Sequence, residues 1–299
     1  MAETERAPGV RDRTVTASDV EYAVRLAVTA LRAGEALDWS VAAGSLEWDC
    51  RETAEHLADD LFAYAAQLGP AEPPLDTLVP FAFARQRPGG PANAVFADRE
   101  AGVPGLLQVI ESAGALLTAI VRTKPATVRA HHGFGASDPE GFAAMGVLET
   151  LVHTHDIAEG LGLAWDPDPD LCDRVLHRLL PDAPAGTDRW TTLLWCTGRA
   201  DLPGRPRLTE WRWYGEPRPA GATPAPVAES RRADVSRRSP VPSAHHWKVG
   251  AETTAAALIS VLAVDLVITG DYLYAAFASF GAATFARDAV KRIRSRAGR

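Results

Sequence analysis

Lysine and cysteine are both scarce in this chain of 299 residues. Lysine occurs three times among the 31 lysine and arginine residues, and the three cysteines show no CxxC spacing. The cysteine pattern argues against a cysteine zinc cluster and is typical of a reducing cytoplasm. An excess of positive charge is also lacking, because the net charge is −7. Nucleic acid is therefore not expected as the main partner, since phosphate contacts need a basic face.

The first residues, 1–15, are polar and charged and lack an apolar core. We expect them to be disordered, and we expect no signal peptide. Hydrophobic residues make up 46% of the whole chain, which is enough for a packed core. The abundance of arginine, alanine, proline and glycine indicates a GC-rich genome.

Apolar residues at helical spacing predict four long helices in the first half of the chain. Their expected spans are about 16–39, 49–69, 104–123 and 138–162. Ser18 is a candidate N-cap for the first helix, Asp49 and Glu52 form a capping box for the second, and Pro139 suits the first turn of the fourth. A loop rich in proline and glycine, 70–102, separates the second helix from the third. The sequence therefore predicts a mainly α protein built on a helical bundle.

The second half of the chain divides into shorter segments. We expect an extension packed on the bundle, with a helix over about 169–180 and a short strand or extended stretch at "RLTEWRWYG". Four tryptophans should attach this extension to the bundle: Trp190, Trp195, Trp211 and Trp213. The predicted division is 1–15, 16–166 (the bundle), 167–214 (the extension), 215–250 (a linker rich in proline and arginine) and 251–299 (an apolar helical hairpin with a basic end).

The predicted hairpin contains two apolar stretches, 253–269 and 272–286, with arginines on both flanks. Each stretch is shorter than the roughly 20 residues that a spanning helix needs, and Asp265 is costly in lipid. The flanking arginines nevertheless suit a hairpin with both ends in the cytoplasm. Insertion into a membrane and packing on the bundle or on a second subunit both stay open.

Candidate functional residues concentrate in "LETLVHTHDIAEGLG", residues 148–162. Glu149 and His153 are four residues apart and therefore share one face of a helix, and Asp156 stays on that face. His155 points to nearly the opposite side. A carboxylate and an imidazole at this spacing can chelate a divalent cation, although an ordinary polar helix face has the same pattern.

A third ligand must come from another helix, and His56 in "CRETAEHLADD" is the best candidate. Its position should turn inward, where an imidazole without a partner is costly to bury. A core histidine bonded to the backbone or to Asp60 is the alternative. His131 and His132 lie in the loop before the fourth helix, either at the rim of the site or as solvated loop residues. The long loop also holds Arg85 and Arg87, which are candidates for binding a carboxylate.

Two segments carry a resemblance to a known family. "WDCRETAEHLADDLFAY" resembles the region of the first metal-binding histidine in the mycothiol-dependent maleylpyruvate isomerase family, part of the DinB-like superfamily of four-helix metalloproteins. "LETLVHTHDIAEGLG" resembles the second motif of that family, E-x-x-x-H-x-x-D. The likeness covers residues 16–166, and "LLWCTGRADLPGRPRLTEWRW" resembles an extension of related actinobacterial members. It implies a DinB-like four-helix bundle with a small C-terminal extension, here followed by an apolar helical tail.

The resemblance implies that His56, Glu149 and His153 bind a divalent metal, zinc, with one position open to water. Asp156 falls on the aspartate of the motif, where it either orients His153 or caps the helix. Mycothiol is the implied co-substrate, and its thiolate would attack a small electrophile in an isomerisation or an S-transfer. A non-catalytic metal-binding module in stress response or regulation stays open as the alternative. The expected location is the cytoplasm, with membrane association through 253–286 as a further expectation.

Overall fold

The computed structural model describes residues 13–218. Within this range the protein is mainly helical, with α-helices, one short 3₁₀ helix and isolated β-bridges but no β-strand. The predicted mainly α class is therefore confirmed. The predicted apolar tail, 251–299, and its stretches 253–269 and 272–286 lie outside the described residues, as does most of the predicted linker.

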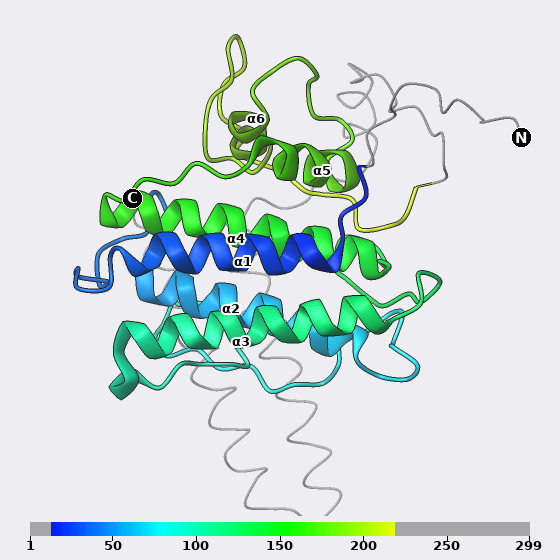
Figure 1. The fold of residues 1–299 in the computed structure, drawn as a ribbon, viewed down its shortest axis with the longest axis horizontal. Helices are drawn as coiled ribbons and strands as arrows, with labels where there is room; N and C mark the ends of the chain where they lie inside the picture. The colour runs from blue at the N-terminus through cyan, green and yellow to red at the C-terminus, as the bar shows by residue number, and fades with distance from the viewer. Residues whose placement is uncertain (1–12, 219–299) are drawn as a thin grey trace, which may run out of the picture. The chain divides into compact units, whose positions relative to one another are not determined.

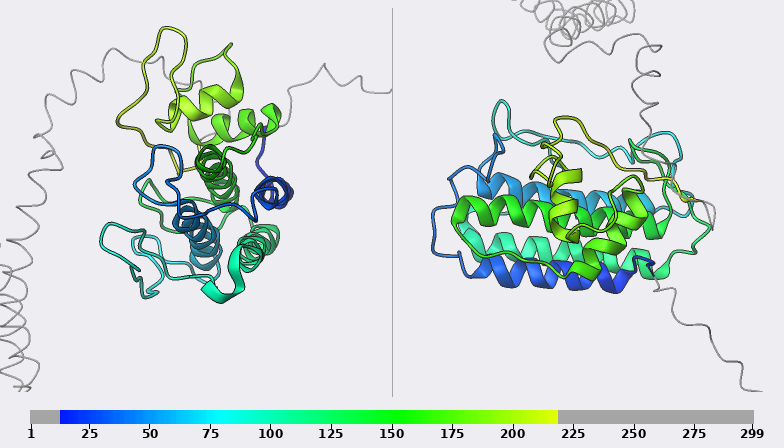
Figure 2. Two further views of the ribbon diagram at one scale, coloured as in Figure 1. Left: turned by 90° about the vertical axis from the view of Figure 1, so that its left-hand side faces the viewer. Right: turned by 90° about the horizontal axis from the view of Figure 1, so that it is seen from above.

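Four long helices lie side by side, as Figures 1 and 2 show. They are α1 (Ala17–Arg32), α2 (Cys50–Leu68), α3 (Gly102–Thr123) and α4 (Pro139–Leu161). Helices α1 and α2 each pack against both α3 and α4. The apolar side chains of all four helices meet in one core, where Leu31, Leu61, Leu117 and Leu148 are fully buried.

The ends of the first two helices follow from their capping residues. Helix α1 begins two residues earlier than Ser18 suggests, because the backbone N–H and the hydroxyl of Thr16 both donate to Asp19 Oδ2 at 2.8 Å. It ends at Arg32, before Gly34 and well short of the predicted end. Helix α2 begins as predicted, since the capping box of Asp49 and Glu52 is present.

Helix α4 is the most enclosed of the four. Asp138 accepts the backbone N–H of Gly141 at 2.8 Å and so caps the start, Pro139 occupies the first turn, and Gly162 ends the helix with a φ of 68°. Most of its side chains are buried, because α1, α2 and α5 all pack against it. Polar groups on α4 are consequently buried as well, and each needs a partner inside the protein.

The extension is built on two shorter helices. Helix α5 (Pro169–Leu179) packs on α4, and α6 (Arg189–Cys196) packs on α5, above the four long helices in Figure 1. Trp190 and Trp213 are buried and Trp195 is partly buried. Trp211 is the most exposed of the four, at 38%, and its ring lies 5.8 Å from that of Trp213.

One helical segment of the described chain, Arg99–Thr123, is long and apolar enough to cross a membrane by length and composition. It comprises the 3₁₀ helix η1 (Arg99–Ala101) and α3. The buried residues of α3 pack toward α1 and α2. The core helix of a bundle meets the same criteria, so the segment by itself is weak evidence for a membrane span.

Candidate metal centre

Two neighbouring helices supply the polar groups of the site. His56 and Asp60 are four residues apart on α2 and so occupy one face of that helix. Glu149 and His153 have the same spacing on α4. Because α2 and α4 pack directly against each other, the two pairs meet between the helices.

The side chains converge on His153. Ligand atoms of His56, Asp60 and His153 all lie within 4.8 Å of one another. The Oδ2 atom of Asp60 lies 3.5 Å from His56 Nε2 and 4.0 Å from His153 Nε2. Glu149 Oε2 lies 3.2 Å from the same Nε2 atom of His153. These four side chains are called here the polar cluster. His56, Asp60 and His153 form the mutually close group, and Glu149 adjoins it through His153, so Asp60 stands in this group where the sequence predicted Glu149.

Asp60 is the member of the polar cluster that sequence reasoning did not name as a ligand. From the sequence, Asp60 was considered only as a possible hydrogen-bond partner of His56. The available signal was the spacing itself, since Asp60 follows His56 by one helical turn. That signal is weak, because Asp59 is adjacent and the sequence does not show which of the two faces α4.

The polar cluster fits a divalent cation. Asp60 Oδ2 is buried and has no hydrogen-bond partner, although two imidazoles lie nearby. Burial raises the pKa of Asp60 well above its usual range, and the charge of Glu149 acts in the same direction. A carboxylate oxygen in such surroundings is costly unless a cation compensates it. Two imidazoles with carboxylate oxygens are a donor set that zinc accepts.

His153 is held by charged groups on both of its ring nitrogens. Its Nδ1 atom lies 3.3 Å from Asp156 Oδ2, while Nε2 faces Glu149. Burial disfavours the charged form of His153, but hydrogen bonds to Asp156 and Glu149 outweigh burial and raise the pKa to about 9. Asp156 in turn accepts from Arg199, with Nη2 to Oδ2 at 2.7 Å and Nε to Oδ1 at 2.9 Å. Asp156 thus pairs with Arg199 and faces the ring of His153 rather than the helix end.

Arg199 follows α6 and belongs to the extension, so this part of the chain contributes to the site. Sequence reasoning missed Arg199, because an arginine within "CTGRA" gives no sign of its partner 43 residues earlier. Both side chains of the pair are nearly enclosed, with exposed fractions of 10% for Arg199 and 2% for Asp156. Burial opposes the charge of Asp156, yet the hydrogen bonds from His153 and Arg199 lower its pKa.

His56 has a neutral partner instead. Its Nδ1 atom lies 3.2 Å from Oδ1 of the buried Asn93, which belongs to the long loop between α2 and α3. Burial lowers the pKa of His56 to about 4, and the charge of His153 acts in the same direction. The ring of His56 is therefore uncharged at neutral pH and carries one N–H. With Nδ1–H donating to Asn93, the lone pair of Nε2 is directed at the polar cluster, as is usual for a histidine that binds a metal.

The other candidate histidines lie apart from the polar cluster. His155 points away, as expected, and packs its ring edge-on to Trp190 at 5.6 Å. His131 and His132 are both partly buried. Trp213 of the extension covers His132 in a stack with 5.5 Å between the ring centroids.

A hollow of about 280 Å³ opens beside the polar cluster. His56 and Asp60 lie at one side of it, and His131 and His132 also line it. The long loop closes another side with apolar side chains. The candidate metal centre is therefore accessible to a small molecule rather than sealed in the core.

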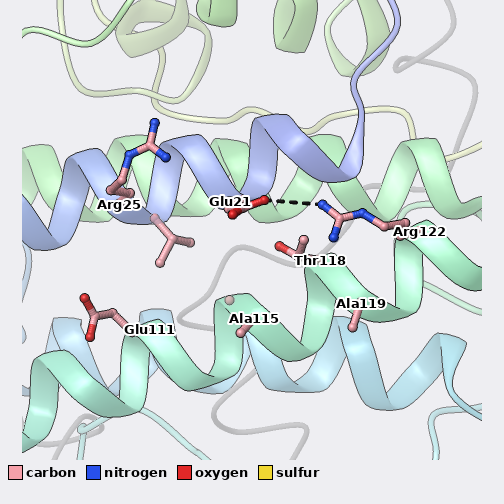
Figure 3. Close-up of a pocket in the computed structure, with 9 residues that line it drawn as sticks. Glu21, Arg25, Glu111, Ala115, Thr118, Ala119 and Arg122 are labelled. Atoms are coloured by element: carbon pink, nitrogen blue, oxygen red, sulfur yellow. Dashed lines mark hydrogen bonds and ion pairs between the residues drawn. The ribbon is translucent and has the colours of Figure 1, made fainter.

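A second hollow, of about 360 Å³, lies between α1 and α3 (Figure 3). Glu21 of α1 and Arg122 of α3 both line it and form an ion pair at 3.3 Å, with Thr118 nearby. None of the residues that line it is a histidine or a cysteine. Its lining therefore lacks the imidazole and thiol ligands typical of a zinc site, and the hollow at the polar cluster is the stronger candidate.

None of the three cysteines of the chain belongs to the polar cluster. All three are buried, and burial raises the pKa of Cys50 to about 11 and those of Cys172 and Cys196 to about 12. None is therefore a thiolate at neutral pH.

Comparison of the chain with family models, curated proteins and solved structures found no match.

Proposed function

We propose that the protein is a metal-dependent enzyme that uses a low-molecular-weight thiol, mycothiol, to isomerise a small electrophile or to transfer sulfur to it. The four long helices would then be a DinB-like bundle, and zinc the resident cation. The observation that carries this proposal is the buried Asp60 oxygen, which has no hydrogen-bond partner and lies between two imidazoles at the edge of an open hollow.

The side chains have separate tasks in this proposal. His56, His153 and the carboxylates of Asp60 and Glu149 supply the ligand set for the cation. A bound divalent cation supplies Lewis acidity, which lowers the pKa of a coordinated thiol to the neutral range. Asp156 and Arg199 hold the ring of His153, and Asn93 holds that of His56. The hollow admits the electrophile next to the thiol.

The burial of the chain's own cysteines also favours an external thiol. A nucleophilic cysteine needs a thiolate at working pH and access to substrate. Cys50, Cys172 and Cys196 have neither, because each is buried with a raised pKa. Sulfur chemistry at the polar cluster would therefore rely on a co-substrate.

The direct test compares His153→Ala with His155→Ala. Both histidines lie on α4, but only His153 belongs to the polar cluster. Elemental analysis of the purified wild-type protein should give about one zinc per chain, and His153→Ala should lower metal affinity by more than about 100-fold, beyond the loss typical for a supporting residue. His155→Ala should keep its metal.

The same proteins should then be tested for consumption of mycothiol with a panel of electrophiles. Consumption in the wild type and in His155→Ala, but not in His153→Ala, supports the enzyme. Metal binding without any thiol consumption would instead support the non-catalytic metal-binding module. A wild-type protein that binds no divalent cation would contradict both.

A further inference from the structure

The hollow beside the polar cluster has an apolar entrance. Leu78, Phe81 and Phe83, all in the long loop between α2 and α3, line it while remaining 54%, 42% and 48% exposed. Phe142 of α4 lines it from inside the bundle and is fully buried. Large apolar side chains rarely gather on a surface without a binding role. An apolar ligand that enters here would cover them.

Among residues 13–218, no cationic side chain lines the hollow to receive an anionic ligand. In the described part of the chain, no arginine and no lysine lines it, whereas the carboxylates of Asp59 and Asp60 do. Arg85 and Arg87, the loop arginines singled out from the sequence, are already engaged. Arg87 forms an ion pair with Glu52, and Arg85 donates to the carbonyl oxygen of Gly90. The sequence-based hypothesis that they bind a carboxylate therefore finds no support at the hollow.

His132 provides one polar contact for a ligand. Its Nδ1 atom accepts the backbone N–H of Phe134 at 3.1 Å, so the proton of the neutral ring is on Nε2. Burial lowers the pKa of His132 to about 4 and thus keeps the ring neutral. The stack on Trp213 fixes the plane of the ring. His132 therefore offers one oriented N–H donor to a hydrogen-bond acceptor such as a carbonyl oxygen.

We propose that the hollow binds an uncharged, apolar electrophile that carries a carbonyl oxygen, and that His132 Nε2–H donates to that oxygen. An aromatic enone has this chemistry, and a dicarboxylate does not. The proposal rests on the proposed function, because it names the substrate class of the same site. It can nevertheless be tested by binding alone.

The test uses two enones that differ in one group. Benzalacetone is neutral, and 4-carboxybenzalacetone carries an added carboxylate. Calorimetric titration of the chelator-treated, metal-free protein, without thiol, should show that the neutral enone binds about tenfold more tightly or better, because the added charge would lie near two carboxylates without a cation. Leu78→Arg should reverse this preference. Leu78 is exposed, so the fold should tolerate the change.

A second variant examines the donor. His132→Phe keeps an aromatic ring against Trp213 but removes the N–H group. It should weaken binding of benzalacetone up to about tenfold, the value of one hydrogen bond, and leave binding of 4-phenyl-1-butene, which has no carbonyl, unchanged. An equal loss for both ligands would show that His132 only packs.

The outcomes separate the two proposals. Tighter binding of the neutral enone without thiol consumption would support this inference and count against the proposed enzyme. Equal or tighter binding of the carboxylate would overturn the inference, whether or not thiol is consumed. Circular dichroism of each variant checks that the helices are intact, and the wild-type comparison of the two enones stands even if a variant does not fold.

Discussion

The two histidines of the polar cluster are supported in opposite ways. On α2, His56 is hydrogen-bonded to the neutral amide of Asn93, and burial lowers its pKa to about 4. On α4, burial acts on His153 too, but Asp156 and Glu149 raise its pKa to about 9. One imidazole is therefore neutral and the other charged in the absence of a cation. A divalent cation would replace the proton of the second and use the free lone pair of the first.

The two histidines also receive their support from different segments of the chain. Asn93 comes from the long loop between α2 and α3, and Arg199 comes from the extension after α6. Each of the two histidines thus depends on a residue from outside the four long helices. We refer below to the α2 side (His56 and Asn93) and the α4 side (His153, Asp156 and Arg199).

The largest effect is expected on the α4 side, from Asp156→Asn. The substitution leaves the guanidinium of Arg199, which is 10% exposed, without its carboxylate partner. Breaking a buried ion pair from one side costs about 3–5 kcal/mol. Urea unfolding of the chelator-treated protein should show a loss of this size, and the double variant Asp156→Asn/Arg199→Met should recover much of it. If the double variant is as unstable as the single one, the ion pair does not carry the stability.

A smaller effect is expected on the α2 side, from Asn93→Ala. The change removes the acceptor for His56 Nδ1 without introducing an unpaired charge. Zinc affinity should fall about 10–100-fold, as is typical when a supporting residue of a metal ligand is removed. Competition with a chelating dye measures it. Gln86→Ala is the control in the same loop, since Gln86 accepts from the exposed Arg99 and has no contact with His56.

The helices were predictable because their signals are local. The capping box at Asp49 and the proline at the start of α4 are read directly from the chain, and both are present. The i, i+4 spacing also predicted that Glu149 and His153 share a face, and the two lie 3.2 Å apart. The start of α1 was predicted less well, because Thr16 and Ser18 are both good caps and only Asp19 decides between them.

The supporting residues were not predictable for the opposite reason. Asn93 and Arg199 reach the site from segments without regular structure, 37 and 43 residues from their partners. No periodicity relates such positions. The burial of His132 has the same origin, because Trp213 arrives from the far end of the extension. Local patterns located the helices and their faces, while the contacts that complete the site depend on tertiary structure.

The smallest effect should come from a second arginine–carboxylate pair, Arg87 with Glu52, which links the long loop to α2 near the α2 side. It resembles the pair of Arg199 and Asp156 in chemistry, but Arg87 is 45% exposed and solvent screens the interaction. The hydrogen bond from Arg87 lowers the pKa of Glu52 below its ordinary value of 4.5. Stability from this pair is therefore present above that value and is lost as the pH falls through the lowered pKa of the folded protein.

Arg87→Gln should accordingly lower the melting temperature slightly at pH 7, by much less than Asp156→Asn. The difference from the wild type should shrink as the pH falls below 4.5, where Glu52 becomes protonated in both proteins. Thermal unfolding across this range, at low and high salt, measures it, and high salt should also reduce the difference. A loss at pH 7 as large as that of Asp156→Asn would mean that burial does not separate the two pairs, and the contrast between the two sides would then need another cause.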